Sequence, residues 1–347
     1  MKIGLDATYA TGGSLSGVGV YSRELLHGLA RLHPEVAWRW FYRPHRWREV
    51  LSGRGRRFLW ESSLPGCELF HGLGQRLPAA FDSPSRRVRS VATFHDLFVM
   101  TREYSTAEFR ARFTQQAQEA ARRADAIIAV SHFTAGQVRD LLGVEAARLH
   151  VVHHGVRPLP LPAGVARERV VLCVGALQTR KNTAALVRAF ARTPPGWRLI
   201  LAGSRGYGYE QAIAPVIEAS PRRADIELPG WVSDEELARL YARASVFAFP
   251  SLDEGFGIPV LEAMAAGVPV LASNTSSLPE VCGDAALLVD PQDEEEVAAG
   301  MLRLIEDGAL RTELIARGQT RASEFTWEDC ARKTWEVFSS LLARPRS

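Results

Sequence analysis

Two segments of the chain combine charged side chains and glycines at spacings that suit the binding of a diphosphate and of sugar hydroxyls. In the first, Arg180 and Lys181 stand directly before a predicted helix at 183–191. Two cations, free amide groups and a helix dipole together favour a diphosphate site. A solvated, charged surface loop is the alternative interpretation of this pair.

The second segment contains Glu254 and Glu262, which are separated by seven residues. Glu254 follows a predicted strand at 246–249, and Glu262 lies about one turn into a predicted helix at 259–266. Gly255 and Gly257 would let the backbone approach a ligand closely, with amide groups directed at it. One carboxylate then suits the hydroxyls of a sugar and the other suits a ribose diol. Two solvated acids beside a helix cap would not account for these glycines.

The first half of the chain offers two weaker candidates. His95 follows a predicted strand at 89–94, where an imidazole can donate a hydrogen bond to a sugar or a phosphate. Residues 12–19 form a glycine-rich loop between the first predicted strand and a helix, and Gly17 and Gly19 close it. The glycines do not have the spacing of a dinucleotide fingerprint, but such a loop suits the approach of an anion to a helix start.

Strands alternate with helices through both halves of the chain, which predicts two α/β domains, each a doubly wound parallel sheet. The predicted strands are 2–7, 36–42, 69–71, 89–94, 126–130 and 149–153 in the first half, and 170–174, 197–202, 226–228, 246–249, 268–272 and 286–289 in the second. Since ligands bind at the carboxyl ends of parallel strands, the candidate residues fall at the functional edges of the two sheets.

Prolines at 158, 160 and 162 mark a linker, because three prolines in five residues suit neither a helix nor a central strand. We therefore expect a first domain at 1–157, a linker at 158–168 and a second domain at 169–325. A last helix within 326–347 is expected to pack back on the first domain.

Composition is that of an ordinary globular protein, with 46% hydrophobic and 23% charged residues among 347. The four cysteines are scattered, and no apolar run reaches the length of a membrane span, so we expect a cytoplasmic protein with reduced thiols. Arginine and lysine exceed the acids by eight in residues 1–160, whereas the acids exceed them by five in residues 161–347. A basic first half suggests an anionic partner, although no nucleic-acid-binding motif occurs.

Arginine and tryptophan alternate between residues 38 and 60, and two interpretations stay open for this stretch. It could contact an anionic membrane surface, which would place the protein peripherally at the inner face of the membrane and suit a lipid-linked acceptor. It could equally be a strand followed by a solvated loop and helix.

The motifs as a whole resemble the retaining GT-B glycosyltransferases called glycosyl transferase group 1, or family 4. The most specific match is residues 249–273, FPSLDEGFGIPVLEAMAAGVPVLAS, with seven residues between its two glutamates. Further matches lie at 174–182, 201–203, 230–233 and 279–283, and residues 17–21 and 95–97 are similar to the mannosyltransferase-like subset. The resemblance covers nearly the whole chain and implies two Rossmann-like domains that face a cleft.

The resemblance also implies roles for individual residues. Lys181 and Arg180 would neutralise the diphosphate of a nucleotide-sugar donor, Glu254 would bind the sugar, and His95 would lie beside it. The expected donor-binding residues are Gly17, Gly19, Gly203, Val232, Phe256, Gly257, Ile258 and Glu262. Many relatives carry arginine where this chain has Ala176, which leaves Arg180 as the second cation and its detailed role open.

We therefore expect an enzyme of polysaccharide biosynthesis that transfers a hexose, mannose from GDP-mannose being the favoured case, to a glycan, lipid-linked or small-molecule acceptor with retention. No metal or cofactor is expected, because no DxD motif occurs and the two adjacent histidines, His153 and His154, would point to opposite faces of a strand. A nucleotide-sugar-binding protein without catalysis and an NAD-dependent oxidoreductase are the alternatives.

Overall fold

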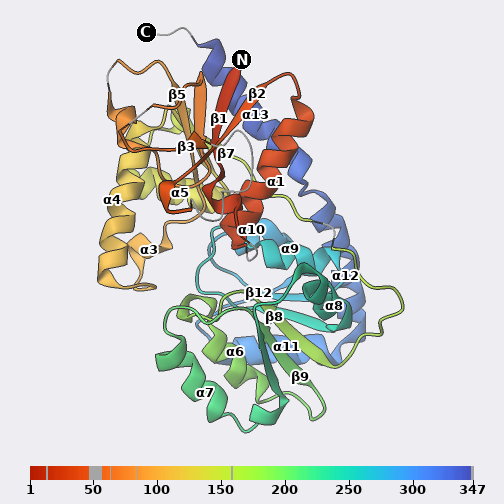
Figure 1. The fold of residues 1–347 in the computed structure, drawn as a ribbon. Helices are drawn as coiled ribbons and strands as arrows, with labels where there is room; N and C mark the ends of the chain where they lie inside the picture. The colour runs from red at the N-terminus through yellow and green to blue at the C-terminus, as the bar shows by residue number, and fades with distance from the viewer. Residues whose placement is uncertain (13–14, 47–56, 63, 84, 158, 345–347) are drawn as a thin grey trace. The chain divides into compact units, whose positions relative to one another are not determined.

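The computed structural model describes residues 1–12, 15–46, 57–62, 64–83, 85–157 and 159–344. The chain divides into two compact units. The first comprises Met1–Gly155 together with Thr326–Ser347, and the second comprises Val156–Phe325. Figure 1 shows the course of the chain through both units.

The first unit is built on a seven-stranded sheet in the order β3-β2-β1-β4-β5-β6-β7, and all its strand pairs are parallel. The strands are β1 (Lys2–Asp6), β2 (Ala37–Tyr42), β3 (Arg57–Phe58), β4 (Leu69–Gly72), β5 (Arg89–Phe94), β6 (Ala126–Ala129) and β7 (Leu149–Val151). The strand order reverses between β1 and β4, so the first unit has its topological switch point there.

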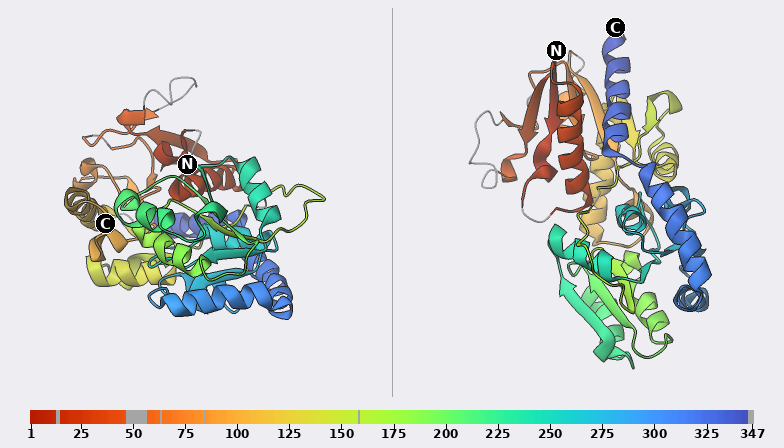
Figure 2. Two further views of the ribbon diagram at one scale, coloured as in Figure 1. Left: turned by 90° about the horizontal axis from the view of Figure 1, so that it is seen from below. Right: turned by 90° about the vertical axis from the view of Figure 1, so that its right-hand side faces the viewer.

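Helices cover both faces of this sheet (Figure 1). They are α1 (Gly17–Leu32), α3 (Phe98–Thr101), α4 (Ala107–Arg123), α5 (His132–Leu142) and α13 (Trp327–Ala343). Leu25 and Leu29 of α1 and Phe338 of α13 pack on one face of the sheet, whereas α4 and α5 pack on the other. Figure 2 shows α13 running alongside α1. The last helix of the chain therefore belongs to the core of the first unit.

The second unit is built on a six-stranded parallel sheet in the order β10-β9-β8-β11-β12-β13. Its strands are β8 (Val170–Val174), β9 (Arg198–Ala202), β10 (Ile226–Gly230), β11 (Val246–Phe249), β12 (Val270–Ser273) and β13 (Leu287–Val289). The order reverses between β8 and β11, which puts the switch point of this sheet at the centre.

The helices of the second unit are α6 (Thr183–Phe190), α7 (Ala214–Glu218), α8 (Asp234–Arg243), α9 (Ile258–Ala265), α10 (Leu278–Cys282), α11 (Glu294–Glu306) and α12 (Gly308–Ser323). Helix α6 packs on α11, and α9 packs on α12 (Figure 1). Ser233 caps α8, because its hydroxyl accepts a hydrogen bond from the amide of Glu236.

Two local predictions were wrong. Helix α9 begins at Ile258, so Pro259 is its second residue and not its first. Strand β7 ends at Val151, so His153 and His154 follow the strand and strand alternation does not set their directions. Two further features were not predicted, the two-residue edge strand β3 and the π-helical turn at Tyr209–Ile213 that leads into α7. Pro158, the first proline of the expected linker, lies outside the described residues.

The tryptophans of β2 pack inward. Trp38 and Trp40 lie against the hydrophobic core under α1 and α13, and the indole nitrogen of Trp38 donates to the carbonyl oxygen of His33 at 2.9 Å. The arginines at 48, 54 and 56 of the predicted membrane-contact stretch lie outside the described residues, and the side chain of Trp60 is 55% exposed. None of the described helices is long and apolar enough to cross a membrane.

We predict that Gly155→Ala destabilises the first unit. A β-carbon at this position would lie 2.2 Å from the backbone nitrogen of Trp327 and 2.6 Å from the carbonyl carbon of Thr326, which are backbone atoms and cannot rotate away. The expected cost is about 1–3 kcal/mol, seen as a melting temperature several degrees lower in scanning calorimetry. The matched control is Gly136→Ala, because α5 leaves open space around Gly136. An unchanged melting temperature in Gly155→Ala would contradict the close packing of these two chain segments.

Candidate functional site

The charged residues predicted from the sequence gather at the switch point of the second sheet. Lys181 follows β8, and Glu254 follows β11, the neighbouring strand. The carboxyl ends of β8 and β11 lie side by side because the two strands pair in parallel. Residues 73 positions apart in the sequence are thereby brought into contact.

Glu254 forms an ion pair with both cations of the first predicted segment. Its Oε1 lies 2.5 Å from Lys181 Nζ, and its Oε2 lies 3.1 Å from Arg180 Nη1. Arg180 Nη1 also donates to the carbonyl oxygen of Asp253. The Lys181 ammonium lies 4.5 Å from the ring centroid of Phe249, which adds a cation–π contact from β11. We call Arg180, Lys181 and Glu254 the ionic cluster.

Burial and neighbouring charges shift the pKa values of Glu254 and Lys181 in opposite directions. Burial by itself would raise the pKa of Glu254, but the positive charges of Arg180 and Lys181 outweigh it and hold that pKa below its usual value. Burial lowers the pKa of Lys181, although the nearby Glu254 opposes this shift. The Glu254 carboxylate therefore stays ionised, and the ionic cluster carries a net charge of plus one when Lys181 is protonated.

The loop that carries Glu254 is held by two serines that follow β12. Ser276 Oγ accepts a hydrogen bond from the amide of Glu254 at 3.0 Å. Ser277 Oγ lies within hydrogen-bond distance of the carbonyl oxygens of Glu254 and Phe256, at 2.9 and 3.0 Å. Ser276 adopts a left-handed backbone with φ of 54°, which is uncommon for a residue other than glycine. The position of Glu254 is thus fixed by backbone as well as by charge.

Gly203 and Gly257, both at this edge of the sheet, leave no room for a β-carbon because neighbouring segments pack closely against them. A β-carbon on Gly203, which follows β9, would lie 1.9 Å from the carbonyl oxygen of Gly175. Gly257 has φ of 107°, and a β-carbon there would lie 2.7 Å from Leu278. Both positions therefore need glycine for the packing of the loops themselves.

Three predicted donor-binding residues, Phe256, Gly257 and Ile258, lie shortly after Glu254 in the sequence, at the amino end of α9. Gly257 precedes the helix, Ile258 begins it, and no side chain caps this end. The Phe256 side chain is buried, and its ring lies 5.8 Å from that of Phe325 in edge-to-face contact. The aromatic ring therefore anchors the loop, and the first amides of α9 have no acceptor within the helix, as at any helix start.

Glu262 is a buried carboxyl group with a different environment from Glu254. It is 6% exposed, and the Tyr241 hydroxyl from α8 donates to its Oε2 at 3.1 Å. Burial raises the pKa of Glu262 to about 7, against the lowering effects of Arg157 and of the Tyr241 hydrogen bond. Arg157 is itself paired with Asp234 at 2.8 Å. Glu262 thus titrates near neutral pH, whereas Glu254 does not.

Val232 lies between β10 and α8 and is partly exposed, next to the 52%-exposed side chain of Trp231. Candidate residues follow β8, β9, β10 and β11, and these four strands belong to one sheet. The structure therefore brings Arg180, Lys181 and Glu254 into direct contact and places Gly203 and Val232 along the same edge.

In the first unit, His95 follows β5 and is 8% exposed. Its Nε2 lies 2.9 Å from the carbonyl oxygen of Leu73, which can only accept, so Nε2 carries the proton. Burial lowers the pKa of His95 to about 4, so the ring is neutral near pH 7 and Nδ1 is an acceptor. The sequence suggested that His95 donates to a sugar or phosphate, whereas in this tautomer its remaining nitrogen accepts.

The His95 ring is held by neighbouring aromatic groups. Tyr21 from α1 meets it edge-on at 4.8 Å, and the ring of His154 stacks on it at 5.4 Å with an interplanar angle of 14°. The candidate glycines lie at the start of α1. Gly19 packs closely, since a β-carbon there would lie 2.8 Å from the carbonyl oxygen of Tyr9, but Gly17 has open space around it.

Sequence analysis missed several residues that shape these sites. Ser276 and Ser277 follow β12, so the rule that led to Glu254 would also have found them. Tyr241 lies inside α8, and no local signal sets it apart from a core residue.

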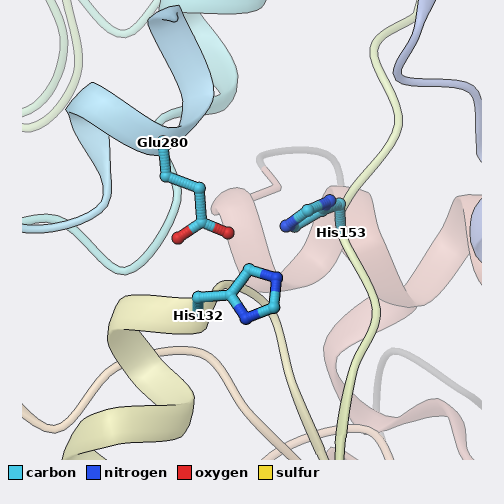
Figure 3. Close-up of side chains that lie close together, drawn as sticks. All are labelled: His132, His153 and Glu280. Carbon is cyan, nitrogen blue, oxygen red and sulfur yellow. The ribbon is translucent and has the colours of Figure 1, made fainter.

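The histidines after β7 have separate environments: the ring of His153 lies 5.9 Å from the ring of His132, whereas His154 packs on His95. Figure 3 draws His132 and His153 of the first unit and Glu280 of α10 in the second.

We predict that the Glu262 carboxyl titrates with a pKa near 7. Tyr241→Phe should raise this pKa further, because it removes the hydroxyl whose hydrogen bond stabilises the ionised carboxylate. The measurement is carbon-13 NMR of labelled glutamate side chains against pH, with Glu262→Gln to assign the signal. The control is Tyr207→Phe, since Tyr207 is 43% exposed in the same unit. A Glu262 signal that titrates at the usual value for glutamate would show that the site is open to water.

Comparison with known proteins places the chain in a family. The sequence model of the family "Glycosyl transferases group 1" matches residues 164–321, and that of "Glycosyltransferase Family 4" matches residues 15–158. O-antigen chain mannosyltransferase B of Escherichia coli is 34% identical over 278 residues, which are 75% of this chain and 73% of that protein. The serotype-specific mannosyltransferase WbdA of Escherichia coli is 28% identical over 275 residues, and the match spans 73% of this chain but only 34% of WbdA.

Solved structures show the same fold over nearly the whole chain. Sucrose-phosphate synthase from Thermosynechococcus elongatus superposes with a TM-score of 0.80 at 23% identity, covering 99% of each chain. HepE from Anabaena, solved in complex with UDP-glucose, superposes with a TM-score of 0.77 at 20% identity, covering 98% of this chain and 99% of that one. With two parallel α/β units and these matches, the chain has the GT-B fold and belongs to the group 1 glycosyltransferase family.

Proposed function

We propose that this glycosyltransferase moves mannose from GDP-mannose to the hydroxyl group of a glycan acceptor, with retention of configuration and without a metal ion. The observation that carries the proposal is the ionic cluster at the switch point of the second sheet. Parallel α/β sheets bind nucleotides at this point, and Arg180 and Lys181 supply charge there in a buried setting.

The charge of the ionic cluster suits a diphosphate. Two cations face one carboxylate, so the cluster has an excess positive charge with Lys181 protonated, and the amino end of α9 adds amide groups and a helix dipole. Thr183, the first residue of α6, has a buried hydroxyl that finds no hydrogen-bond partner among the described residues. A phosphate oxygen near Lys181 could accept from it. As the diphosphate leaves, its growing charge would be stabilised by groups already in place.

The nucleoside and the sugar would be bound by the remaining candidates. Glu262, ionised, would accept hydrogen bonds from the ribose diol, and Val232 would meet the base through its backbone. Glu254 would accept hydrogen bonds from the hydroxyls of the sugar, assisted by the amides of residues 256–258. A mannosyl donor is supported by the names of the matched relatives, O-antigen chain mannosyltransferase B and WbdA, and a nucleotide-sugar donor by the UDP-glucose complex of HepE.

Retention would follow from attack on the same face that the diphosphate leaves. A double displacement needs a nucleophilic carboxylate on the opposite face of the sugar, and among the candidate residues neither glutamate fits. Glu254 is engaged by two cations, and Glu262 is assigned to the ribose. In the proposed step the acceptor oxygen bonds to the anomeric carbon while the bond to the phosphate oxygen breaks, and the departing phosphate takes the acceptor's proton.

We expect one nucleoside diphosphate, GDP, to raise the melting temperature in a metal-free panel that also contains UDP, dTDP, ADP and NAD. Lys181→Ala should weaken this binding by about tenfold to a hundredfold, the worth of a charge-assisted hydrogen bond. The control is Lys333→Ala, since Lys333 is 40% exposed on α13 and pairs with Asp329. Stabilisation by NAD alone would contradict the proposal. Stabilisation by UDP or dTDP alone would indicate a UDP-sugar or a dTDP-sugar as the donor in place of GDP-mannose.

We expect proton NMR of the first-formed product to show the α-anomer when GDP-α-mannose is the donor, in buffer containing EDTA. The assay should follow transfer to an oligomannoside, whose new glycosidic linkage does not equilibrate between anomers. Glu254→Gln should lower kcat by at least about a hundredfold, because the carboxylate that orders both cations is lost. A β-linked product would exclude attack from the leaving-group face, and activity abolished by EDTA would exclude the metal-free mechanism.

A further inference from the structure

Three buried polar side chains are hydrogen-bonded to one another in the core of the first unit. Thr93 of β5 is at their centre. Its Oγ1 lies 2.9 Å from the hydroxyl oxygen of Tyr21 on α1 and 2.8 Å from Nε2 of His71 on β4. None of the three residues is more than 1% exposed. We call Tyr21, Thr93 and His71 the buried polar network.

The register of the strands brings Thr93 and His71 to one face of the first sheet. Strands β4 and β5 pair in parallel with His71 opposite Val91, so Thr93 lies two residues further along on the same face. Helices α1 and α13 cover this face, because Val91 packs in the same core as Leu25 and Phe338. The ring of Phe338 also meets that of His71 edge-on at 5.4 Å. The sheet itself therefore sets the positions of two of the three members.

The hydrogen bonds of the buried polar network orient its members more than they stabilise the fold. Buried hydroxyl and imidazole groups lose their hydration, and a hydrogen bond between them mainly offsets that loss. Burial, and then the nearby His95, lower the pKa of His71 to about 3, so this ring is neutral at pH 7. Its Nδ1 makes no hydrogen bond among the described residues, whereas its Nε2 bonds to Thr93. The network thus ends at His71 and holds the Tyr21 hydroxyl through Thr93.

The ring of Tyr21 carries this fixed position to His95. Its centroid lies 4.8 Å from that of His95 at an interplanar angle of 79°, and 4.8 Å from that of His154 at 88°. The two imidazoles stack on each other, so Tyr21 meets both rings of the stack with one orientation. Its hydroxyl is held at Thr93, two residues before His95 along the chain. Tyr21 is therefore fixed by a hydrogen bond at one end and packs on the histidine at the other.

Contact between rings alone would hold His95 less strictly. Edge-to-face aromatic contacts are favourable over a range of positions, whereas a hydrogen bond is narrow in distance and angle. Nε2 of His95 donates to the carbonyl oxygen of Leu73, and this bond keeps its geometry only while the ring stays in place. The hydroxyl of Tyr21 supplies the directional restraint that its ring cannot supply by packing.

We propose that Tyr21 is a positioning residue for His95 and that Thr93 and His71 act through it. The buried polar network holds His95 with Nε2 on Leu73, and Nδ1 is then the nitrogen that accepts a hydrogen bond from a sugar hydroxyl. This inference rests on the proposed transferase function and on the expected place of His95 beside the sugar. It assigns a function to a hydroxyl that lies inside the core and does not touch the substrate.

The first test needs no substrate. Nitrogen-15 spectra of the histidine rings at pH 7.5, with His95→Gln to assign the signals, should show His95 as one Nε2–H tautomer. Tyr21→Phe keeps the ring but removes the hydroxyl, and it should shift these signals toward the average of two tautomers. Thr93→Val should do the same, whereas Thr93→Ser, which retains a hydroxyl, should leave the signals unchanged.

The second test separates positioning from a general effect on folding. Tyr21→Phe should lower kcat for mannosyl transfer by about fivefold to tenfold, the worth of one hydrogen bond. In a His95→Ala background the same substitution should change kcat by less than about twofold, because its effect passes through His95. Thermal melts verify that every variant is folded.

The matched control in both tests is Ser22→Ala. Ser22 is the buried neighbour of Tyr21 on α1, and its hydroxyl finds no hydrogen-bond partner in the part of the chain that the structure describes. Unchanged His95 signals in Tyr21→Phe, or an equal loss of kcat in both backgrounds, would overturn the proposal and indicate a role in core packing alone. Absence of mannosyl transfer by the wild type would contradict the proposed function instead, and the spectra would then decide the role of Tyr21 by themselves.

Discussion

The paired charges of the ionic cluster are the interaction on which the candidate donor site depends. A buried carboxylate is costly unless cations accompany it, and removing one partner of such a pair typically costs about 3–5 kcal/mol. Glu254 therefore requires Arg180 and Lys181, and through them the loop after β11 is tied to the loop after β8. Ser276 and Ser277 fix the same loop from β12, so three strand ends define one rigid edge.

Arginine extends this rigidity to the helices that carry the second glutamate. Of the 42 basic residues only three are lysines, and arginines such as Arg167 and Arg321 donate to backbone carbonyls. Arg167 alone donates to the carboxyl ends of α8 and α9, through carbonyl oxygens that include those of Ala244 and Ala266. Since α8 carries Tyr241 and α9 carries Glu262, one guanidinium links the two helices whose side chains share this hydrogen bond.

Apart from the edge strand β3, the strands of the two parallel sheets and the residues of the ionic cluster were predictable, because hydrophobic periodicity locates strands and chemistry follows their carboxyl ends. The contact between Lys181 and Glu254 was not, since it depends on the order of strands in the sheet. Neither were Asn182 and Ser276 in left-handed conformations, which tertiary packing imposes on residues that rarely adopt them. The stacking of His154 on His95 likewise arises from packing between segments distant in sequence.

In the proposed donor site, the ionic cluster and Glu262 together bind the nucleotide sugar. A crystal structure of the chain grown with GDP-mannose, without added metal, tests it most directly. We expect the diphosphate within hydrogen-bond distance of Lys181, Arg180 and the first amides of α9, with the ribose diol on Glu262. A diphosphate bound away from Lys181, or one held through a metal ion, would contradict it.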